Sequence, residues 1–285
     1  MRIPDCDFAL IGGSGTLSID MPENLGLDYV TTDCEEFCLE TPYGAGGPFK
    51  IFTIESPRGD KKVISCRMHN WQGGVSRGRC SQQAFWVFQQ AGVKKILSEG
   101  GVGAVNYLLK TRDMVIPHDY VDFSLRKDIS LTDNYLLIMR DPFCGDLRKV
   151  IKEQTEKSWA GRVFDLGVYA NTEGRHFESP SEISYMKRAG ADIVGQSVCP
   201  EVYLAREIGA CYAGMYMVVN YAEGVVLPWR HEELADIFYN ESISLGKIMI
   251  DILRNLDISQ NCSCPALRKE TLLTKIYSER KNDDG

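Results

Sequence analysis

The sequence predicts an α/β protein in which helices flank a mixed central β-sheet. Short apolar runs typical of buried strands alternate along the chain with longer segments of helical periodicity. The 285 residues are 44% hydrophobic and show no internal repeat or low-complexity linker. Because α/β folds of this size often form one unit, we expect a single domain over residues 1–285 that ends in a charged tail, frayed from about residue 258.

The expected strands are apolar runs, several of which end at glycine or at a polar residue. They are Phe8–Ile11, Val63–Cys66, Lys95–Ser98, Met114–Ile116, Val163–Ala170, Asp192–Val194 and Tyr212–Val219. Ligands of α/β folds bind beyond the carboxyl ends of such strands, so polar residues close to these ends are candidate ligand contacts. These candidates are Ser14, Arg67, Glu99, Glu178, Ser197 and Asn220.

The segments between the strands carry apolar residues at helical spacing and predict five helices. They are Ser81–Gly92, Cys144–Trp159, Pro180–Ala189, Pro200–Ile208 and His231–Leu256. Gly92 is a typical helix end, and the Ser-Pro-Ser-Glu sequence that begins at Ser179 is a typical helix start. The alternation of these helices with the strands is the pattern of a sheet covered by helices.

Composition and charge exclude several classes of protein. A net charge of -7 disfavours nucleic acid, because an acidic surface repels its phosphates. No run of about 18 apolar residues occurs in the sequence, so no membrane span is expected. The start MRIPDCD places charge where the apolar stretch of a signal peptide would begin. We therefore expect a cytoplasmic protein with no nucleic-acid or membrane partner.

Several of the ten cysteines stand singly in or beside apolar runs, which indicates small buried side chains. Because there is no C-x-x-C pair and there are only four histidines, the sequence predicts no zinc or other metal site. Cys262 and Cys264 are separated by one residue. They are expected to be free thiols or to form a strained, readily reduced bridge, and both interpretations stay open.

Two stretches indicate an anion site. Arg67 and His69 follow an apolar run two residues apart, and side chains at that spacing on a strand point the same way. The alternative is a surface ion pair beside a polar loop histidine. The GGSG loop, Gly12–Gly15, can present backbone N–H groups and the Ser14 hydroxyl to a phosphate, or be a tight turn without a ligand.

Other candidates also have two interpretations. Phe177 can stack on a ring and Glu178 can accept from its N–H groups, or both belong to a helix-entry turn. Ser197 either caps a helix or holds an anion. Asn220 ends a very apolar strand and is either a satisfied buried amide or a group that reads a ligand.

Taken together, these residues resemble the trimeric purine nucleoside phosphorylase and methylthioadenosine phosphorylase family. The motifs are GGSG at Gly12–Gly15, TPYG at Thr41–Gly44, RMHNWQG at Arg67–Gly73, VGAVN at Val102–Asn106, EGRHFE at Glu173–Glu178, GADIVGQSVCPEV at Gly190–Val202, and Asn220. The resemblance implies a nucleoside-phosphorylase-like fold and phosphate-dependent cleavage of a purine nucleoside to base and ribose 1-phosphate. It also implies a homotrimer that needs inorganic phosphate as co-substrate and no cofactor.

The resemblance assigns a role to each motif residue. The phosphate ligands are Ser14, Arg67, His69 and Ser197, the base readers with catalytic roles are Glu178 and Asn220, and the other substrate contacts are Trp71, Gly100, Gly101, Phe177, Gln196 and His231. The aminopurine branch of the family has an aspartate where Asn220 stands, so inosine, guanosine or methylthioinosine is the expected substrate. The alternatives are a methylthioadenosine phosphorylase and a degenerate nucleoside-binding homologue or hydrolase.

Some positions depart from the family pattern. Glu99 places a carboxylate near the expected phosphate, which is repulsive unless Glu99 points away or pairs with Arg67; in a hydrolase it would orient water. The 5′ substituent is expected to be read by the region Leu227–Ile237 and by a neighbouring subunit. The neighbour's contribution is expected to come from the region of Leu136 and Leu137.

Overall fold

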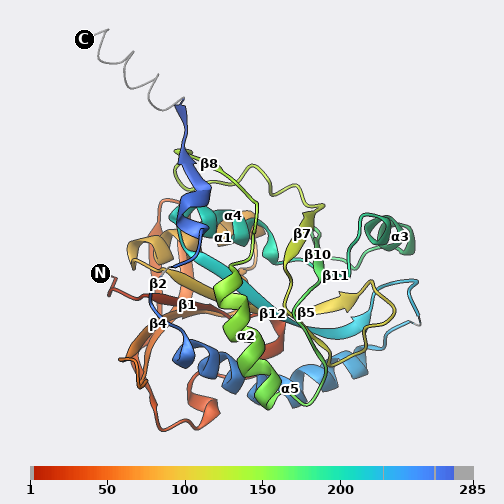
Figure 1. Ribbon diagram of the computed structural model, residues 1–285, viewed down its shortest axis with the longest axis horizontal. Coiled ribbons are helices and arrows are strands. Elements are labelled where there is room, and N and C mark those ends of the chain that lie inside the picture. The colour runs from red at the N-terminus through yellow and green to blue at the C-terminus, as the bar shows by residue number, and fades with distance from the viewer. Residues whose placement is uncertain (1–2, 227, 260, 273–285) are drawn as a thin grey trace.

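The computed structural model describes residues 3–226, 228–259 and 261–272. Within these residues an 11-stranded mixed sheet forms the centre, with β2-β3-β4-β1-β5-β11-β10-β7 in spatial order and β12, β6 and β9 continuing from β5. Helices α1 and α4 pack against each other, and α2 packs against α5 (Figure 1). The α/β fold class with a mixed central sheet is confirmed.

The strands include all the regions expected from apolar runs. They are β1 Phe8–Ile11, β2 Val30–Thr41, β3 Gly44–Ile54, β4 Lys61–Cys66, β5 Lys95–Ala104, β6 Met114–Val115, β7 Asp119–Asp122, β8 Tyr135–Leu137, β9 Val163–Phe164, β10 Val168–Asn171, β11 Ile193–Gly195, β12 Cys211–Tyr221 and β13 Arg268–Glu270. The single strand expected over Val163–Ala170 is wrong, because the segment divides into β9 and β10. The hairpin β2–β3 was not expected, since β2 is half exposed and rich in polar residues.

The five expected helices are confirmed to within a few residues. They are α1 Arg77–Gln90, α2 Gly145–Ser158, α3 Pro180–Arg188, α4 Val198–Ile208 and α5 His231–Asn255, and the 3₁₀ turns are η1 Ser14–Thr16, η2 Glu23–Leu25, η3 Met68–Asn70 and η4 Cys264–Leu267. Within the tail expected from residue 258, residues 264–270 form η4 and β13, which pairs with β8. Residues 273–285 lie outside the described chain.

The sheet divides at β5, and this division positions the site. Strand β1 pairs with β5 only as far as Ser98, whereas β11 pairs with β5 from Gly103 onward. The stretch between these two residues therefore faces an opening rather than a neighbouring strand. On its other side β5 pairs with β12 along its whole length.

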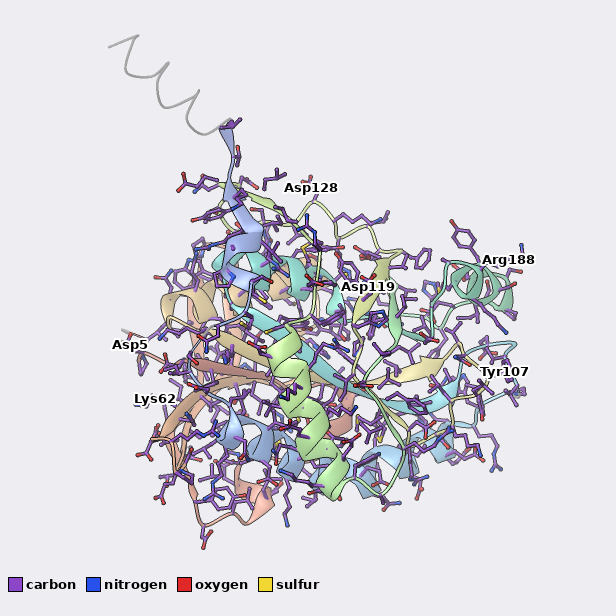
Figure 2. All side chains as sticks on the ribbon, viewed as in Figure 1. Asp5, Lys62, Tyr107, Asp119, Asp128 and Arg188 are labelled. Carbon is purple, nitrogen blue, oxygen red and sulfur yellow. The ribbon has the colours of Figure 1, made fainter. Side chains whose placement is uncertain are left out.

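Many charged side chains lie at the surface of the fold. Figure 2 shows Asp5, Lys62 and Arg188 at the periphery, and all three are exposed. The interior is filled by large apolar and aromatic side chains such as Phe8, Phe49 and Tyr216. Among the described residues, no helix combines the length and the apolar character needed to cross a membrane.

Candidate active site

A cavity of about 370 Å³ lies at the division of the sheet. Of the twelve site residues predicted from the sequence, ten line it. They are Ser14, His69, Trp71, Gly100, Gly101, Phe177, Glu178, Gln196, Ser197 and Asn220. The structure thus brings together residues from the glycine loop, β5, the segment that enters α4, and β12, which lie far apart in the sequence.

One part of the cavity presents a carboxylate and an amide. The Glu178 side chain is buried, and its Oε1 accepts a hydrogen bond of 2.5 Å from the Thr172 hydroxyl. The second carboxylate oxygen can accept from a ligand. A capping box at Ser179 begins α3 one residue later, so the backbone beside Glu178 is held by the start of that helix.

Asn220 reaches the same cavity because β12 is irregular. The pairing register with β5 shifts between Val218 and Asn220, and such a bulge re-aims the side chains that follow it. Asn220 Nδ2 donates to the Tyr221 carbonyl at 2.8 Å, and the side chain lines the cavity with Val219. The amide is therefore buried with a backbone partner, and it also lines the cavity.

An aromatic pair borders the cavity beside Glu178. The rings of Phe177 and Trp229 lie 4.8 Å apart at 57°. Phe177 is 51% exposed, which leaves ring surface free to stack on a planar ligand. Leu234 and Phe238 of α5 add apolar surface to the lining.

His69 is held by a buried carboxylate that sequence reasoning missed. Its Nδ1 lies 2.7 Å from Glu201 Oε1, and both side chains are almost fully buried. Tyr212 donates to the other Glu201 oxygen at 2.7 Å. Because this contact engages Nδ1, the other ring nitrogen, Nε2, is the one that faces Gly13 and Gly100. Glu201 lies 132 residues from His69, so no local pattern could reveal the pair.

Arg67 does not line the cavity, and the expectation that it points the same way as His69 is wrong. Strand β4 ends at Cys66, and Met68, His69 and Asn70 then adopt φ values of 48°, 54° and 58°. The side-chain alternation of a strand does not apply to this left-handed turn. The Arg67 guanidinium donates instead to the carbonyls of Leu17 and Ile19 at 3.0 and 3.1 Å.

Glu99 occupies the backbone donors that the glycine loop was expected to offer to phosphate. Its Oε1 accepts from Gly13 N–H at 2.6 Å, from Thr16 N–H at 3.1 Å and from the Thr16 hydroxyl at 2.7 Å. Burial raises the pKa of this carboxyl in spite of those bonds. Glu99 does not belong to the cavity lining, so it points away from the expected phosphate. It holds the glycine loop from the side that does not line the cavity.

The loop leaves its serine available at the cavity. Ser14 Oγ accepts from Gly101 N–H at 2.9 Å, which ties the loop to the open stretch of β5. Gly13 must be glycine here, because an added Cβ would lie 2.3 Å from the Glu99 carbonyl oxygen. Across the cavity Ser197 is the N-cap residue of α4 without a side-chain capping bond; its Oγ lies 3.3 Å from the Tyr169 hydroxyl.

Guanidinium groups reach the cavity from Arg77 and Arg175, neither of which was predicted as a ligand. Arg77 lies 3.8 Å above the Trp71 ring and donates to Gln196 Oε1 at 2.7 Å. Burial and the like charges of Arg126 and Arg175 lower the pKa of Arg77. Such an accumulation of positive charge favours an anionic ligand.

His231 is the second predicted residue that the cavity does not include. It is the exposed first residue of α5, and the same helix contributes Leu234 and Phe238 one and two turns later. His231 lies on the same helix face as Leu234 and Phe238, at i, i+3 and i+7, but it is at the exposed first position of α5, one turn before the first residue that lines the cavity. Leu227, where the expected 5′ region begins, lies outside the described residues.

The chain belongs to the phosphorylase superfamily, because the model of that family matches residues 7–254. Membership makes it an enzyme of the pentosyltransferase class, as the resemblance implied. A protein of Moorella thermoacetica named "Probable 6-oxopurine nucleoside phosphorylase" is 30% identical over 90% of this chain and 96% of its own length. An "S-methyl-5'-thioadenosine phosphorylase" of Nitrosopumilus maritimus is 26% identical over 93% and 98% of the two chains.

The fold is shared with solved structures. A methylthioadenosine phosphorylase from an antarctic soil metagenomic library superposes with a TM-score of 0.72, at 21% identity, covering 95% of this chain and 96% of the other. At that identity the likeness concerns the fold. It confirms the nucleoside-phosphorylase-like architecture expected from the motifs.

Proposed function

We propose that this enzyme cleaves 6-oxopurine nucleosides by phosphorolysis, releasing the base and ribose 1-phosphate. The observation that carries the proposal is the convergence of Glu178 and Asn220 on one cavity with the hydroxyls of Ser14 and Ser197 and the imidazole of His69. The first two are groups that read a base, and the other three are groups that bind an anion. Relatives named as 6-oxopurine nucleoside phosphorylases support the same assignment.

The pairing of a carboxylate with an amide favours a 6-oxopurine. Such a base presents an N1–H donor to Glu178 and the N7 and O6 acceptors to the Asn220 amide. Adenine offers an acceptor at N1, which would face the Glu178 carboxylate without a proton between them. Leaving buried polar groups unpaired in this way discriminates strongly between substrates.

The chemistry then depends on positioning and charge. A phosphate oxygen attacks C1′ while the C1′–N9 bond breaks, and the electron pair of that bond passes to the purine. Asn220 can donate to N7 as negative charge develops there, which stabilises the leaving base. Positive charge for the incoming phosphate comes from Arg77 and Arg175, and the His69 imidazole adds a nitrogen that can hydrogen-bond to it.

A hydrolase is the less favoured alternative. It would need a base that orients water in the cavity, and Glu99 was the residue considered for that role. Glu99 instead faces Gly13 and Thr16 and does not line the cavity. Its position fits a residue that holds the loop for phosphate.

The 5′ substituent is proposed from the apolar lining. Trp229, Leu234 and Phe238 contribute apolar surface, which favours a methylthio group at the 5′ position. Methylthioinosine is therefore a substrate to test beside inosine, and methylthioadenosine is the second candidate.

We also propose a cytoplasmic homotrimer. The exposed Leu136 of β8, 66% accessible in the single chain, is the surface expected to meet a neighbouring subunit.

The deciding experiment measures base release from inosine, guanosine, methylthioinosine and methylthioadenosine, with and without phosphate. Phosphate-dependent release from the 6-oxopurine nucleosides supports the proposal. Release from methylthioadenosine alone retains phosphorolysis and overturns the role given to Glu178 and Asn220. Release without phosphate indicates a hydrolase, and no release from any of the four contradicts the proposed activity. Size-exclusion chromatography with light scattering tests the trimer.

A further inference from the structure

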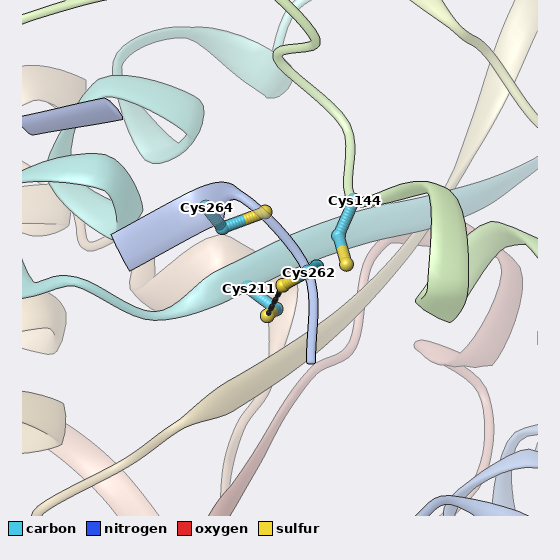
Figure 3. Close-up of side chains that lie close together, drawn as sticks. All are labelled: Cys144, Cys211, Cys262 and Cys264. Carbon is cyan, nitrogen blue, oxygen red and sulfur yellow. Dashed lines mark hydrogen bonds between the residues drawn. The ribbon is translucent and has the colours of Figure 1, made fainter. Parts of the chain in front are cut away.

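Four cysteines meet at one point on the opposite end of β12 from the cavity residue Asn220. Cys211 is the first residue of that strand, Cys144 is the N-cap residue of α2, and Cys262 and Cys264 come from the segment that follows α5 (Figure 3). Their Sγ atoms all lie within 4.8 Å of one another, and those of Cys211 and Cys262 are 3.2 Å apart. Three of the four are buried and Cys262 is half-buried.

We propose that these four cysteines bind one structural Zn²⁺ ion. A tetrahedral ion with Zn–S bonds of about 2.3 Å has sulfurs about 3.8 Å apart. Four sulfurs that are already within 4.8 Å of each other form a group of that size. Soft thiolate ligands in a four-sulfur set favour zinc over the hard cations.

The grouping is a specific feature of these four residues. Among the described residues, the other six cysteines take part in no such group. The four sulfurs surround one point, and Figure 3 shows Cys211 and Cys262 in direct contact with Cys144 and Cys264 beside them. A common centre is what a metal requires, whereas disulfides need only pairwise contacts.

Arginines lie where they can offset the charge of the site. Zn²⁺ with four thiolates carries a net charge of -2, which is costly to bury without cations. Arg206 is 3% exposed and donates to the Cys264 carbonyl at 3.2 Å and to the Asp141 carbonyl at 2.8 Å. It thereby joins the segments that carry Cys264 and Cys144. Arg148 lies one turn after Cys144, and its buried Nε has no hydrogen-bond partner within the described part of the chain.

The proposed ion would have a structural role. Four protein ligands leave no open coordination position, which is the pattern of structural rather than catalytic zinc. No cysteine lines the candidate active site. The ion would instead clamp η4 and β13 onto the start of β12 and thereby support the pairing of β13 with β8.

The test measures zinc in protein purified without chelator and without a metal column. We expect about one zinc per wild-type chain by elemental mass spectrometry, and about none in Cys144→Ser and Cys264→Ser. Cys6→Ser is the matched control, because Cys6 is also buried but lies outside the cluster, and it should keep its zinc. Cobalt substitution of the wild type should give the thiolate charge-transfer band and the intense d–d bands of tetrahedral Co(II) with four sulfur ligands.

Measurements on the wild type alone can also overturn the proposal. Intact mass under non-reducing conditions distinguishes free thiolates from disulfides, since each disulfide removes two hydrogens. One or two disulfides in place of zinc overturn the proposal. So does a reduced wild-type chain that takes up neither zinc nor cobalt.

Discussion

Strand β12 carries different chemistry at its two ends. At one end Asn220 lines an open cavity together with Glu178, and at the other Cys211 lies in a closed cluster of four sulfurs. Asn220 follows Cys211 by nine positions, which corresponds to roughly 30 Å of extended strand. The same strand thus connects a cavity open to a substrate with a cysteine cluster proposed to hold a structural ion.

This contrast shows how one strand can serve activity at one end and stability at the other. Side chains at the cavity keep polar atoms available for a substrate, whereas the cysteine ligands can all be satisfied within the chain. Substitutions at the cavity should therefore reduce activity without unfolding the protein. Changes at the cluster should reduce stability without altering the chemistry.

The largest expected effect is at Asn220. Asn220→Ala removes the donor proposed for N7 and should lower kcat/KM for inosine by about 10²–10³-fold, the loss typical of one such donor. The melting temperature should change little. Asn255→Ala is the matched control, because that exposed amide also donates to a backbone carbonyl but lies far along α5. Equal activities of the two variants would remove Asn220 from the proposed mechanism.

Glu178→Gln should have the next largest effect. It replaces a charged acceptor for N1–H with a neutral amide and should lower kcat/KM for inosine by about 10- to 100-fold, as expected for a hydrogen bond to a charged group. The exposed Glu153→Gln serves as the control. An unchanged ratio of inosine to methylthioadenosine turnover in Glu178→Gln would contradict the specificity argument.

Phe177→Ala should have a smaller effect that falls mainly on binding. Loss of the stacking surface costs about 1–1.5 kcal/mol, which corresponds to a KM for the nucleoside about tenfold higher. Steady-state kinetics at saturating phosphate separates KM from kcat. A kcat that falls as much as KM rises would show that the ring does more than bind the base.

Removing metal from the cysteine cluster should lower stability and leave activity almost unchanged, the opposite of the substitutions in the cavity. Treating the wild type with a thiol-displacing reagent and a chelator should lower the melting temperature by roughly 10 °C. Base release per folded molecule at 25 °C should change by less than about twofold, because the cluster lies outside the cavity. A large loss of activity with no loss of stability would contradict the view that the cluster supports stability and the cavity supports activity.

The smallest expected effect is a pH dependence at Glu99. Burial raises its pKa in the folded state above the ordinary value of 4.5, so the folded state binds the proton more tightly than the unfolded chain. Its contribution to stability is therefore largest below pH 4.5 and declines as the pH rises through the raised folded-state pKa. Glu99→Gln removes this decline.

Urea unfolding of wild type and Glu99→Gln from pH 4 to 7 measures that contribution. The stability of the wild type minus that of the variant should decrease as the pH rises. A difference that increases with pH would show that the bonds from Gly13 and Thr16 outweigh burial. Base release by Glu99→Gln should still require phosphate, since Glu99 does not line the cavity.

Local sequence patterns determined the element order and most of the site. Apolar runs and helical spacing locate β1, β4, β5, β12 and all five helices, because burial of one face imposes a period on the sequence. The motif residues Phe177, Glu178 and Asn220 also meet as expected, because strand ends of one sheet converge on the same cavity. Hairpin β2–β3 escaped prediction since its first strand is half exposed and lacks an apolar run.

Tertiary structure alone decided which neighbours the charged and sulfur groups meet. The left-handed turn after β4 separates Arg67 from His69, and Glu201 reaches His69 from 132 residues away. Glu99 turns toward the glycine loop, and cysteines from three distant segments converge on β12. The physical reason is the same in each case: hydrogen bonds and thiolate ligation depend on distances of a few ångströms between segments, and only the packed fold sets those distances.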